Sequence, residues 1–508
     1  MVRDMATAAL LGMSAGGVMD AFVIAFRVPN LFRRLFGEGA LAASYLPVLS
    51  AELESDRARA WQLVSVLMTW VAVILAIVVV LGELLCGLLW LNSDGTRVYL
   101  LMGLVAVMLP YLLFICLAAQ ISATLHALNR FGMPAFVPVL LNLVWIVGAL
   151  WVAPWVAPHG KEPQAYVLAV CVLIGGVLQM TVQVPLLFKL GFRFDYNWGG
   201  ARPAVKRIVI TLMPMLFGLA VTQINTLMDS VIAWLFSAQQ KGLPIEWLGG
   251  DWKYPMQQGA AAAVYYGERL YQLPVGILGV AVATVIFPLL SRHAARGERE
   301  KIGEDLALGL RLVLFLALPA TAGLFLLAQP LARLLFERGE FQPEDTVRTA
   351  DMIRYYGLGV WAYCALPVLI RGFYAQQDAK SPLRIGMWIV ALNLILNAIL
   401  IWPLAEVGLA LSTAAAAGLQ AIWLTVTFTR QTGRLDWRAI VVTCCRGAAA
   451  SIAMSGAGLL TLRLLPAGDQ LTMQFITVVL PVAVCVVVYL LAYSILGGSE
   501  WRILTSGQ

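Results

Sequence analysis

The chain contains few charged residues. Asp, Glu, Lys and Arg make up 12% of its 508 residues, whereas 61% are hydrophobic and the mean hydropathy is +0.83. A composition this apolar excludes an ordinary soluble globular protein. Apolar runs of about 20 residues recur along the chain with short polar gaps, and runs of this length cross a bilayer as helices. The sequence therefore predicts an all-α polytopic membrane protein without a sizeable extramembrane domain.

The side chains that most catalytic and metal sites need are also scarce. The three histidines fall in predicted connections, and the seven cysteines lie in or beside apolar runs without C-x-x-C spacing. The sequence has no G-x-x-x-x-G-K-[ST] phosphate loop. The longest predicted outer loop, residues 237–258, offers Glu246 and Asp251 but no histidine to pair with them. These absences argue against an enzyme, and we expect no cofactor other than a sodium ion.

Lys and Arg are unevenly distributed among the connections. They gather after the even-numbered predicted spans, for instance at 189–207 and 292–301, and are rarer on the opposite side. Cytoplasmic loops carry such an excess, so both termini are predicted to be cytoplasmic. The net charge of +7 therefore reflects topology, and no nucleic-acid partner is expected. The fourteen predicted spans lie near residues 5–19, 20–48, 62–92, 98–125, 134–157, 164–189, 205–236, 259–290, 305–327, 350–373, 383–403, 406–428, 440–464 and 472–497.

Three sequence patches in the first half recur in the second half. The matching pairs are Leu46–Ser50 with Phe287–Ser291, Arg27–Pro29 with Arg269–Pro274, and Ala127–Arg130 with Ala375–Asp378. An even number of predicted spans separates the copies, so the two repeats run parallel to each other. Chance similarity of short patches is the alternative.

The repeat predicts two six-helix lobes around a central cavity, with two additional helices at the C-terminus. The predicted boundaries are an N-terminal lobe at 1–190, a cytoplasmic linker at 191–203, a C-terminal lobe at 204–429 and the additional helices at 430–508.

Charged residues interrupt the second predicted span. Asp20, Arg27 and Arg34 are spaced i, i+7, i+14 and so share one face of a helix, with Glu38 beyond them. Each charge in hydrocarbon costs at least ~2.5–3.5 kcal/mol, so such residues usually face a water-filled cavity or a charged partner. We predict a cavity wall. Arginines that reach the lipid headgroups from a helix end are the alternative, although this does not account for Asp20.

Arginines outnumber acidic residues in the charged part of the predicted spans. A membrane span needs about 20 apolar residues, but in the first predicted span only two residues precede Arg3 and Asp4. We therefore expect the chain to start inside that helix and both residues to lie in the membrane. The eighth span adds Glu268 and Arg269. Guanidinium groups bind phosphate and pyrophosphate with paired hydrogen bonds, so the predicted cargo is anionic. A network of internal ion pairs is the alternative.

A second polar set is predicted to hold a sodium ion. Asp229 lies in the middle of the seventh span, Asn393 and Asn397 share one face of the eleventh, and Thr413 lies in the twelfth. Carboxylate, amide and hydroxyl oxygens are ligands that a hard cation prefers. Hydrogen bonds that hold helices together are an equally good interpretation.

The motifs around these charges resemble a known family. The pattern is RD at 3–4, DAF-x-x-AF-R-x-PN-L-x-RR-x-F-x-EG-A from Asp20 and P-x-L-S from Pro47, followed by related segments at 128–138, 268–276 and 372–382. Together they resemble the MurJ (MviN) family of lipid II flippases in the multidrug/oligosaccharidyl-lipid/polysaccharide (MOP) exporter superfamily. The resemblance covers essentially the whole chain. Two departures are the missing Ser-Arg pair before Arg3 and Gln272 at a position where glutamate is expected.

This resemblance implies a function and a site. It implies a bacterial inner-membrane protein that moves undecaprenyl-pyrophosphate-linked peptidoglycan precursor to the outer leaflet by alternating access. It also implies a groove formed by the two C-terminal helices, and as partners lipid II, membrane lipids and cell-wall synthesis proteins, with the protein itself a monomer. The alternative is a cation-coupled exporter of a drug or another polysaccharide-lipid. The residues that the resemblance places at the substrate are Arg3, Asp20, Arg33 and Arg269, with Arg27, Arg34 and Glu38 beside them.

Overall fold

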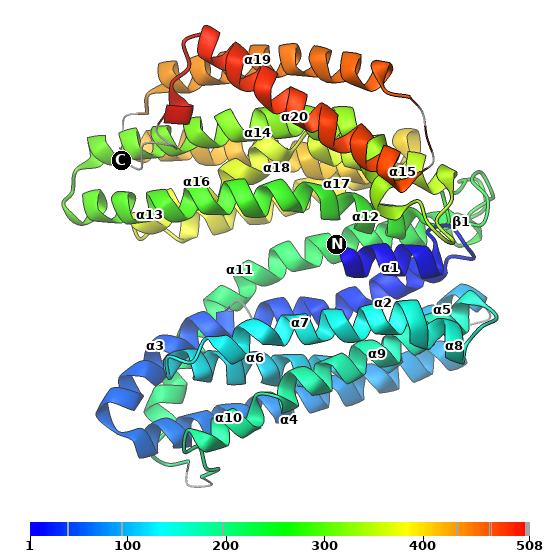
Figure 1. Ribbon diagram of the computed structural model, residues 1–508. Coiled ribbons are helices and arrows are strands. Elements are labelled where there is room, and N and C mark those ends of the chain that lie inside the picture. Colours follow the sequence, from blue (N-terminus) through cyan, green and yellow to red (C-terminus); the bar gives the residue numbers. More distant parts are fainter. Residues whose placement is uncertain are drawn as a thin grey trace. The chain divides into compact units, whose positions relative to one another are not determined.

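A computed structural model of the chain describes residues 1–37, 40–92, 95–195, 198–432, 435–466, 468 and 470–502 (Figure 1). Within these residues the chain is helical almost throughout, and one two-stranded sheet pairs β1 (Ser237–Ala238) with β2 (Met256–Gln257). The predicted all-α class is confirmed. Contacts divide the chain into two compact units, Met1–Gln239 with Gln257–Ala262, and Gln240–Met256 with Ala263–Gln508.

The helices of the first unit are α1 (Val2–Leu11), α2 (Val18–Phe32), η1 (Arg33–Gly37), α3 (Ala40–Ser55), α4 (Arg57–Leu91), α5 (Thr96–Met108), α6 (Tyr111–Ala127), α7 (Gly132–Val147), η2 (Gly148–Val152), α8 (Ala153–Val156), α9 (Lys161–Thr181), α10 (Val184–Lys189) and α11 (Arg202–Leu235). The contacts place α11 in this unit because it packs against α2, η1 and α3. The sequence had assigned this helix to the C-terminal lobe.

The helices of the second unit are η3 (Glu246–Leu248), α12 (Ala260–Pro274), whose residues 260–262 belong to the first unit, η4 (Val275–Gly279), α13 (Val280–Ala295), α14 (Arg299–Phe336), α15 (Pro343–Gly357), α16 (Val360–Ala375), α17 (Lys380–Leu404), α18 (Glu406–Thr432), α19 (Trp437–Leu464) and α20 (Leu471–Ile495). Helices α19 and α20, orange to red in Figure 1, pack against each other and against α14.

The multi-pass architecture is evident from helix length and composition. Among the described residues, eleven helical segments are long and apolar enough to cross a membrane, or twelve if the bent pair α15 and α16 is one span. The first two predicted spans are not among them. Helix α1 has ten residues, and residues 38–39 between η1 and α3 lie outside the described part of the chain. The number fourteen therefore stays a prediction.

Each unit has its own apolar core. In the first unit Tyr45, Trp61 and Phe192 are buried together, and the hydroxyl of Tyr45 is hydrogen-bonded to that of Thr124 at 2.8 Å. In the second unit the rings of Phe373 and Phe428 meet edge to face with centroids 5.4 Å apart. Because these clusters join helices far apart in the sequence, they fix the helix packing that positions the polar residues.

One buried carboxylate ties α19 and α20 to α14. Glu500 accepts hydrogen bonds from Arg311 of α14 at 2.7 and 3.1 Å, from Thr443 of α19 at 2.8 Å and from Tyr493 of α20 at 2.6 Å. Its side chain is 1% exposed. Burial by itself would raise the pKa of Glu500, but hydrogen bonds from Tyr493, Arg311 and Thr443 outweigh it and lower this pKa to about 2. The group is therefore an anion at neutral pH.

The repeated sequence patches adopt repeated backbone conformations. A residue with positive φ lies two positions after the end of both α6 and α16, Asn129 at 58° and Gln377 at 60°. In both cases the next amide donates to the carbonyl five residues back, from Arg130 to Leu125 and from Asp378 to Phe373. This is the Schellman arrangement that closes a helix C-terminus. The second and eighth predicted spans likewise each contain one π turn, η1 and η4.

Candidate substrate-binding site

Arg3 is held against aromatic rings and a carboxylate in the first unit. Its guanidinium group donates to Asp4 at 2.9 and 3.3 Å and lies 4.5 Å from the ring centroid of Trp145. The indole N–H of Trp145 donates to the hydroxyl of Thr7, which in turn donates to the carbonyl of Arg3. A cation over an aromatic face is attracted by the ring, so Trp145 fixes the guanidinium group while Asp4 offsets its charge. The sequence analysis did not single out Trp145.

Asp20 caps the first turn of α12. One carboxylate oxygen accepts a hydrogen bond from the backbone N–H of Gly259 at 2.7 Å, and the other accepts from Ala262 at 2.9 Å. The first N–H groups of a helix have no partner inside it and carry partial positive charge, so they stabilise a carboxylate. These donors explain how Asp20 is tolerated at full burial. Its predicted contact with substrate stays a prediction.

Arg27 and Arg34 both reach α11. Arg27, which is 8% exposed, donates to the backbone carbonyl of Thr226 at 2.7 Å. Arg34 donates to the side-chain oxygen of Gln223 at 3.2 Å. Residues 223 and 226 are three apart and therefore lie on the same face of α11. Of the predicted stripe of Asp20, Arg27 and Arg34, the two arginines thus both contact α11, whereas Asp20 contacts the start of α12. Gln223, a polar residue within an apolar run, is the sequence signal that could have indicated the contact with α11.

Arg33 has a different environment from Arg34. Its Nε donates to the side-chain oxygen of Asn30 at 2.8 Å, on its own helix. Arg33 is also the first residue of the π turn η1, where the helical register changes. The two adjacent arginines therefore make different contacts: Arg33 donates to Asn30, and Arg34 donates to Gln223 of α11. The predicted site residue Glu38 lies outside the described residues.

Arg269 belongs to α12 in the second unit. Its guanidinium carbon lies 4.5 Å from the ring centroid of Tyr265, and its Nη1 is 3.4 Å from the side-chain oxygen of Gln272. An amide oxygen orients a guanidinium group but, unlike a carboxylate, adds no negative charge. With glutamine at position 272, the pair of Arg269 and residue 272 is one unit more positive than it would be with the expected glutamate.

The residues of the predicted sodium site divide between the units. Asp229, on α11, is 2% exposed and belongs to the first unit, whereas Asn393, Asn397 and Thr413 belong to the second. The amide of Asn397 donates to the oxygen of Asn393 at 3.2 Å, and the amide of Asn393 donates to the hydroxyl of Thr413 at 3.4 Å. Ser412 donates to the oxygen of Asn397. These bonds within α17 and between α17 and α18 are those expected if the polar side chains hold the helices together. The sodium site stays a prediction.

Four arginines of the predicted site each donate a hydrogen bond to an uncharged oxygen. Arg27, Arg33, Arg34 and Arg269 donate to neutral oxygens of Thr226, Asn30, Gln223 and Gln272. Such bonds help to orient the planar groups. Positioned guanidinium groups in a medium of low dielectric constant are suited to binding a phosphate or pyrophosphate.

Comparison with known sequences gives consistent results. A family model described as "Lipid II flippase MurJ" matches residues 7–479. The probable lipid II flippase MurJ of Vibrio cholerae is 34% identical over 433 residues, which cover 82% of this chain and 77% of the relative. The lipid II flippase MurJ of Burkholderia cenocepacia is 33% identical over 419 residues, 80% of this chain and 76% of the relative.

Solved structures share the fold. A structure described as lipid II flippase MurJ in an inward closed conformation aligns with a TM-score of 0.75 at 23% identity, covering 97% of this chain and 95% of the other. An inward-facing multidrug transporter of the MATE family, in the MOP superfamily, aligns with a TM-score of 0.67 at 13% identity over 85% of this chain and 94% of the other. At these identities the likeness concerns the fold alone.

Proposed function

Because the chain belongs to the MurJ family of lipid II flippases, we infer that it moves lipid II from the inner to the outer leaflet and that its positioned arginines bind the pyrophosphate. The molecule is a transporter of the bacterial inner membrane that crosses it many times. The MATE-like fold is compatible with drug export too, but the relatives at 32–35% identity carry the flippase name.

The observation that supports the binding proposal is the excess of arginine over acid in the predicted site, together with the hydrogen bonds that orient these arginines. Arg27 and Arg34 extend from one helix face toward α11, and their bonds to a carbonyl and an amide orient them. Among the acidic residues of the predicted spans, Asp4 pairs with Arg3, and Asp20 accepts hydrogen bonds from the first turn of α12. An anion with several oxygens is the ligand that such a set favours.

The proposed cycle is alternating access. In repeat-built transporters the substrate binds where two halves meet, and the halves move against one another. The arginines would hold the pyrophosphate while the lipid tail stays in the bilayer. We place both termini in the cytoplasm from the distribution of Lys and Arg, and we take the monomer as the working unit. Fusion of a cytoplasm-specific or a periplasm-specific reporter to the C-terminus tests this orientation.

The binding proposal is tested by depletion and complementation in the native bacterium. Depletion should leave lipid II on the cytoplasmic leaflet, and wild-type protein should restore its export. Arg34→Ala should fail to restore export although it reaches the membrane in normal amount. The control is Arg59→Ala, an exposed arginine paired with Asp56 outside the proposed site. Export by Arg34→Ala at the wild-type rate would contradict the role of this arginine.

A further inference from the structure

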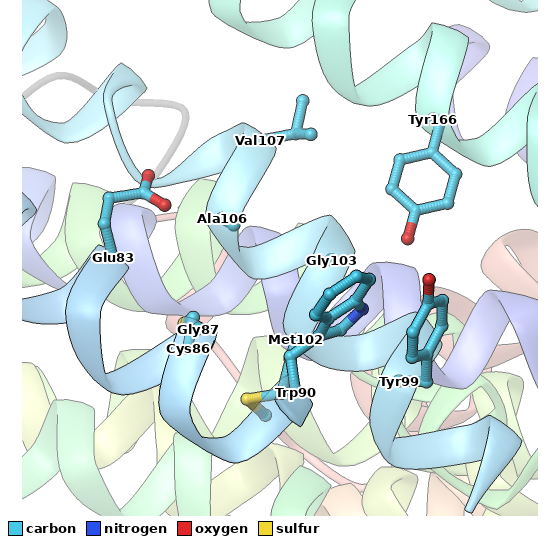
Figure 2. A pocket seen from close by; sticks show the side chains of 10 residues that line it. All are labelled: Glu83, Cys86, Gly87, Trp90, Tyr99, Met102, Gly103, Ala106, Val107 and Tyr166. Atoms are coloured by element: carbon cyan, nitrogen blue, oxygen red, sulfur yellow. The ribbon is translucent and has the colours of Figure 1, made fainter. Parts of the chain in front are cut away.

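A pocket of about 330 Å³ lies within the first unit, among α4, α5 and α9 (Figure 2). It is separate from the arginines described above. Its polar and aromatic lining comes from Glu83 and Trp90 of α4, Tyr99 of α5 and Tyr166 of α9, with Gly87 and Gly103 between them. This volume is at the small end of the range for ligand sites in proteins. The pocket can therefore take a headgroup or another small molecule, but not a protein segment of any size.

Glu83 is a charged residue within a membrane span. It lies eight residues before the end of α4, which corresponds to roughly 12 Å along the helix. Among the residues that the structure describes, no hydrogen bond or ion pair involves its carboxylate. An ionisable group at such depth costs at least ~2.5–3.5 kcal/mol and normally has a partner. A cation bound in the pocket would give the Glu83 carboxylate the partner that the described residues do not supply.

The basic residues at this end of the helices are engaged elsewhere. Arg97 near the start of α5 donates to the carbonyls of Ser237 and Trp234, and Lys161 at the start of α9 donates to the carbonyl of Leu10 at 3.0 Å. Neither is among the residues that line the pocket. The charge that Glu83 brings to the pocket is therefore complementary to a cation supplied from the surroundings.

Aromatic rings form the rest of the pocket wall. The rings of Trp90 and Tyr99 stack with centroids 4.5 Å apart. A Cβ atom at Gly103 would stand 2.0 Å from the hydroxyl of Tyr166, so the glycine is what lets this hydroxyl approach α5. Figure 2 shows the hydroxyls of Tyr99 and Tyr166 turned toward each other. Aromatic faces attract ammonium groups, most strongly where water is excluded.

The surface around the pocket is apolar and exposed. Leu84 and Leu88 on the same helix are 60% and 59% exposed, and Leu85 is exposed as well. In a span, exposed leucines of this kind contact lipid tails. The occupant therefore reaches the pocket from the bilayer, with a cationic head for Glu83 and acyl chains for the leucines.

We propose that this pocket binds the primary ammonium group of phosphatidylethanolamine, with Glu83 as its counter-ion and Trp90, Tyr99 and Tyr166 as its aromatic wall. The site is distinct from the proposed pyrophosphate site and takes a resident lipid, not the cargo. Its occupation neutralises a carboxylate inside the membrane and joins α4, α5 and α9 through a lipid.

The proposal is tested by native mass spectrometry of the full-length protein. Wild-type protein should retain phosphatidylethanolamine at least fivefold more strongly than phosphatidylglycerol with the same acyl chains. Glu83→Gln keeps the shape of the side chain but removes its charge and should abolish this preference. Gly87→Leu should reduce retention by filling the pocket, since a Cβ at Gly87 meets no atom within 4 Å and the fold is not strained.

The matched control is Glu54→Gln, which removes an exposed carboxylate on α3 that does not line the pocket. This variant should keep the wild-type preference. Equal retention of the two lipids by wild-type protein would overturn the proposal, because a neutral Glu83 could then bind a glycerol hydroxyl equally well. An unchanged preference in both Glu83→Gln and Gly87→Leu would also overturn it. Loss of the preference in Glu54→Gln would overturn it as well, because the preference would then arise from surface charge.

Discussion

Arg269 shows how one arginine side chain is held in place. Tyr265 and Gln272 both contact its guanidinium group and orient it. We expect Arg269→Ala to abolish complementation of a depleted strain while the protein still inserts in normal amount. Arg269→Lys should be intermediate, because lysine retains the charge but loses the planar pair of donors.

Two outcomes would contradict this prediction in different ways. Normal growth with Arg269→Ala would show that the arginine is not needed for substrate. Loss of the variant from the membrane would show that Arg269 contributes to folding, as expected for a network of internal pairs. Quantification of the protein in isolated membranes separates the two.

Glu500 gives a prediction about pH. Its pKa is lowered to about 2 in the folded protein, against 4.5 for the free group. A lowered folded-state pKa contributes stability that is present above the unfolded-state value and is lost as the pH falls toward the folded-state value. We expect the thermal stability of purified protein to decline between about pH 4.5 and pH 2 in part through this group.

Glu500→Gln should lower stability at neutral pH by about 2 kcal/mol, because it leaves Arg311 without its carboxylate in a mostly buried setting. The pH dependence between these values should be weaker in this variant. Glu304→Gln, an exposed carboxylate on the same helix α14, is the control and should behave as wild type. An equal loss of stability in both variants would contradict a specific role of Glu500.

At the scale of elements, the helix end at Gln377 carries local strain. A side chain with φ near 60° is less stable than glycine in the same place, and Gln377 is exposed and so loses few contacts on replacement. We expect Gln377→Gly to raise the free energy of unfolding by up to about 1 kcal/mol. Thermal unfolding followed by fluorescence measures this change.

The neighbouring residue provides the control for this prediction. Gln376 has φ −88°, which any residue adopts easily. Glycine there gains nothing in the folded state and increases the freedom of the unfolded chain, so Gln376→Gly should lower stability. A stabilisation of similar size in both variants would show that the effect does not arise from the left-handed conformation.

The second predicted span shows how far sequence reasoning reached. Helical spacing predicted that Arg27 and Arg34 share a face, and both contact α11. Spacing could not predict the π turn at Arg33, since this turn depends on the packing of η1 against α3, α6 and α11. It also could not predict that Asp20 caps α12, because Gly259 lies 239 residues further along the chain. Periodicity reports the face of a helix, whereas the partner is set by tertiary packing.

At the scale of the whole molecule, transport moves charge. The pyrophosphate of lipid II is negative, and its outward movement is favoured by an inside-negative potential at ~2.3 kcal/mol per charge per 100 mV. We expect such a potential to accelerate lipid II export from proteoliposomes at least about fivefold relative to vesicles in which an ionophore has collapsed it. An unchanged rate would show that the loaded step is electrically neutral.

The sodium prediction is tested on the step in which the empty transporter returns to its inward-facing conformation. A cation can bias this step only if it binds the two conformations with different affinity. At fixed potential, we expect Asp229→Asn to weaken flipping and to remove any dependence on sodium, whereas Arg33→Ala should abolish flipping at every sodium concentration. Equal wild-type transport in sodium and in choline would leave Asp229 as a buried packing residue of α11.

The two helix ends with matching backbone geometry provide a pair of equivalent sites for spin labels. Leu128 and Gln376, one in each unit, have φ and ψ of −89° and 13° and of −88° and 9°. Spin labels attached to cysteines at these two positions would start from the same backbone geometry, so their tether distributions should match. A change in the distance between such labels during turnover, with the width of the distribution unchanged, would then indicate movement of one helix end relative to the other. Cys445 is an exposed native cysteine that would first have to be replaced.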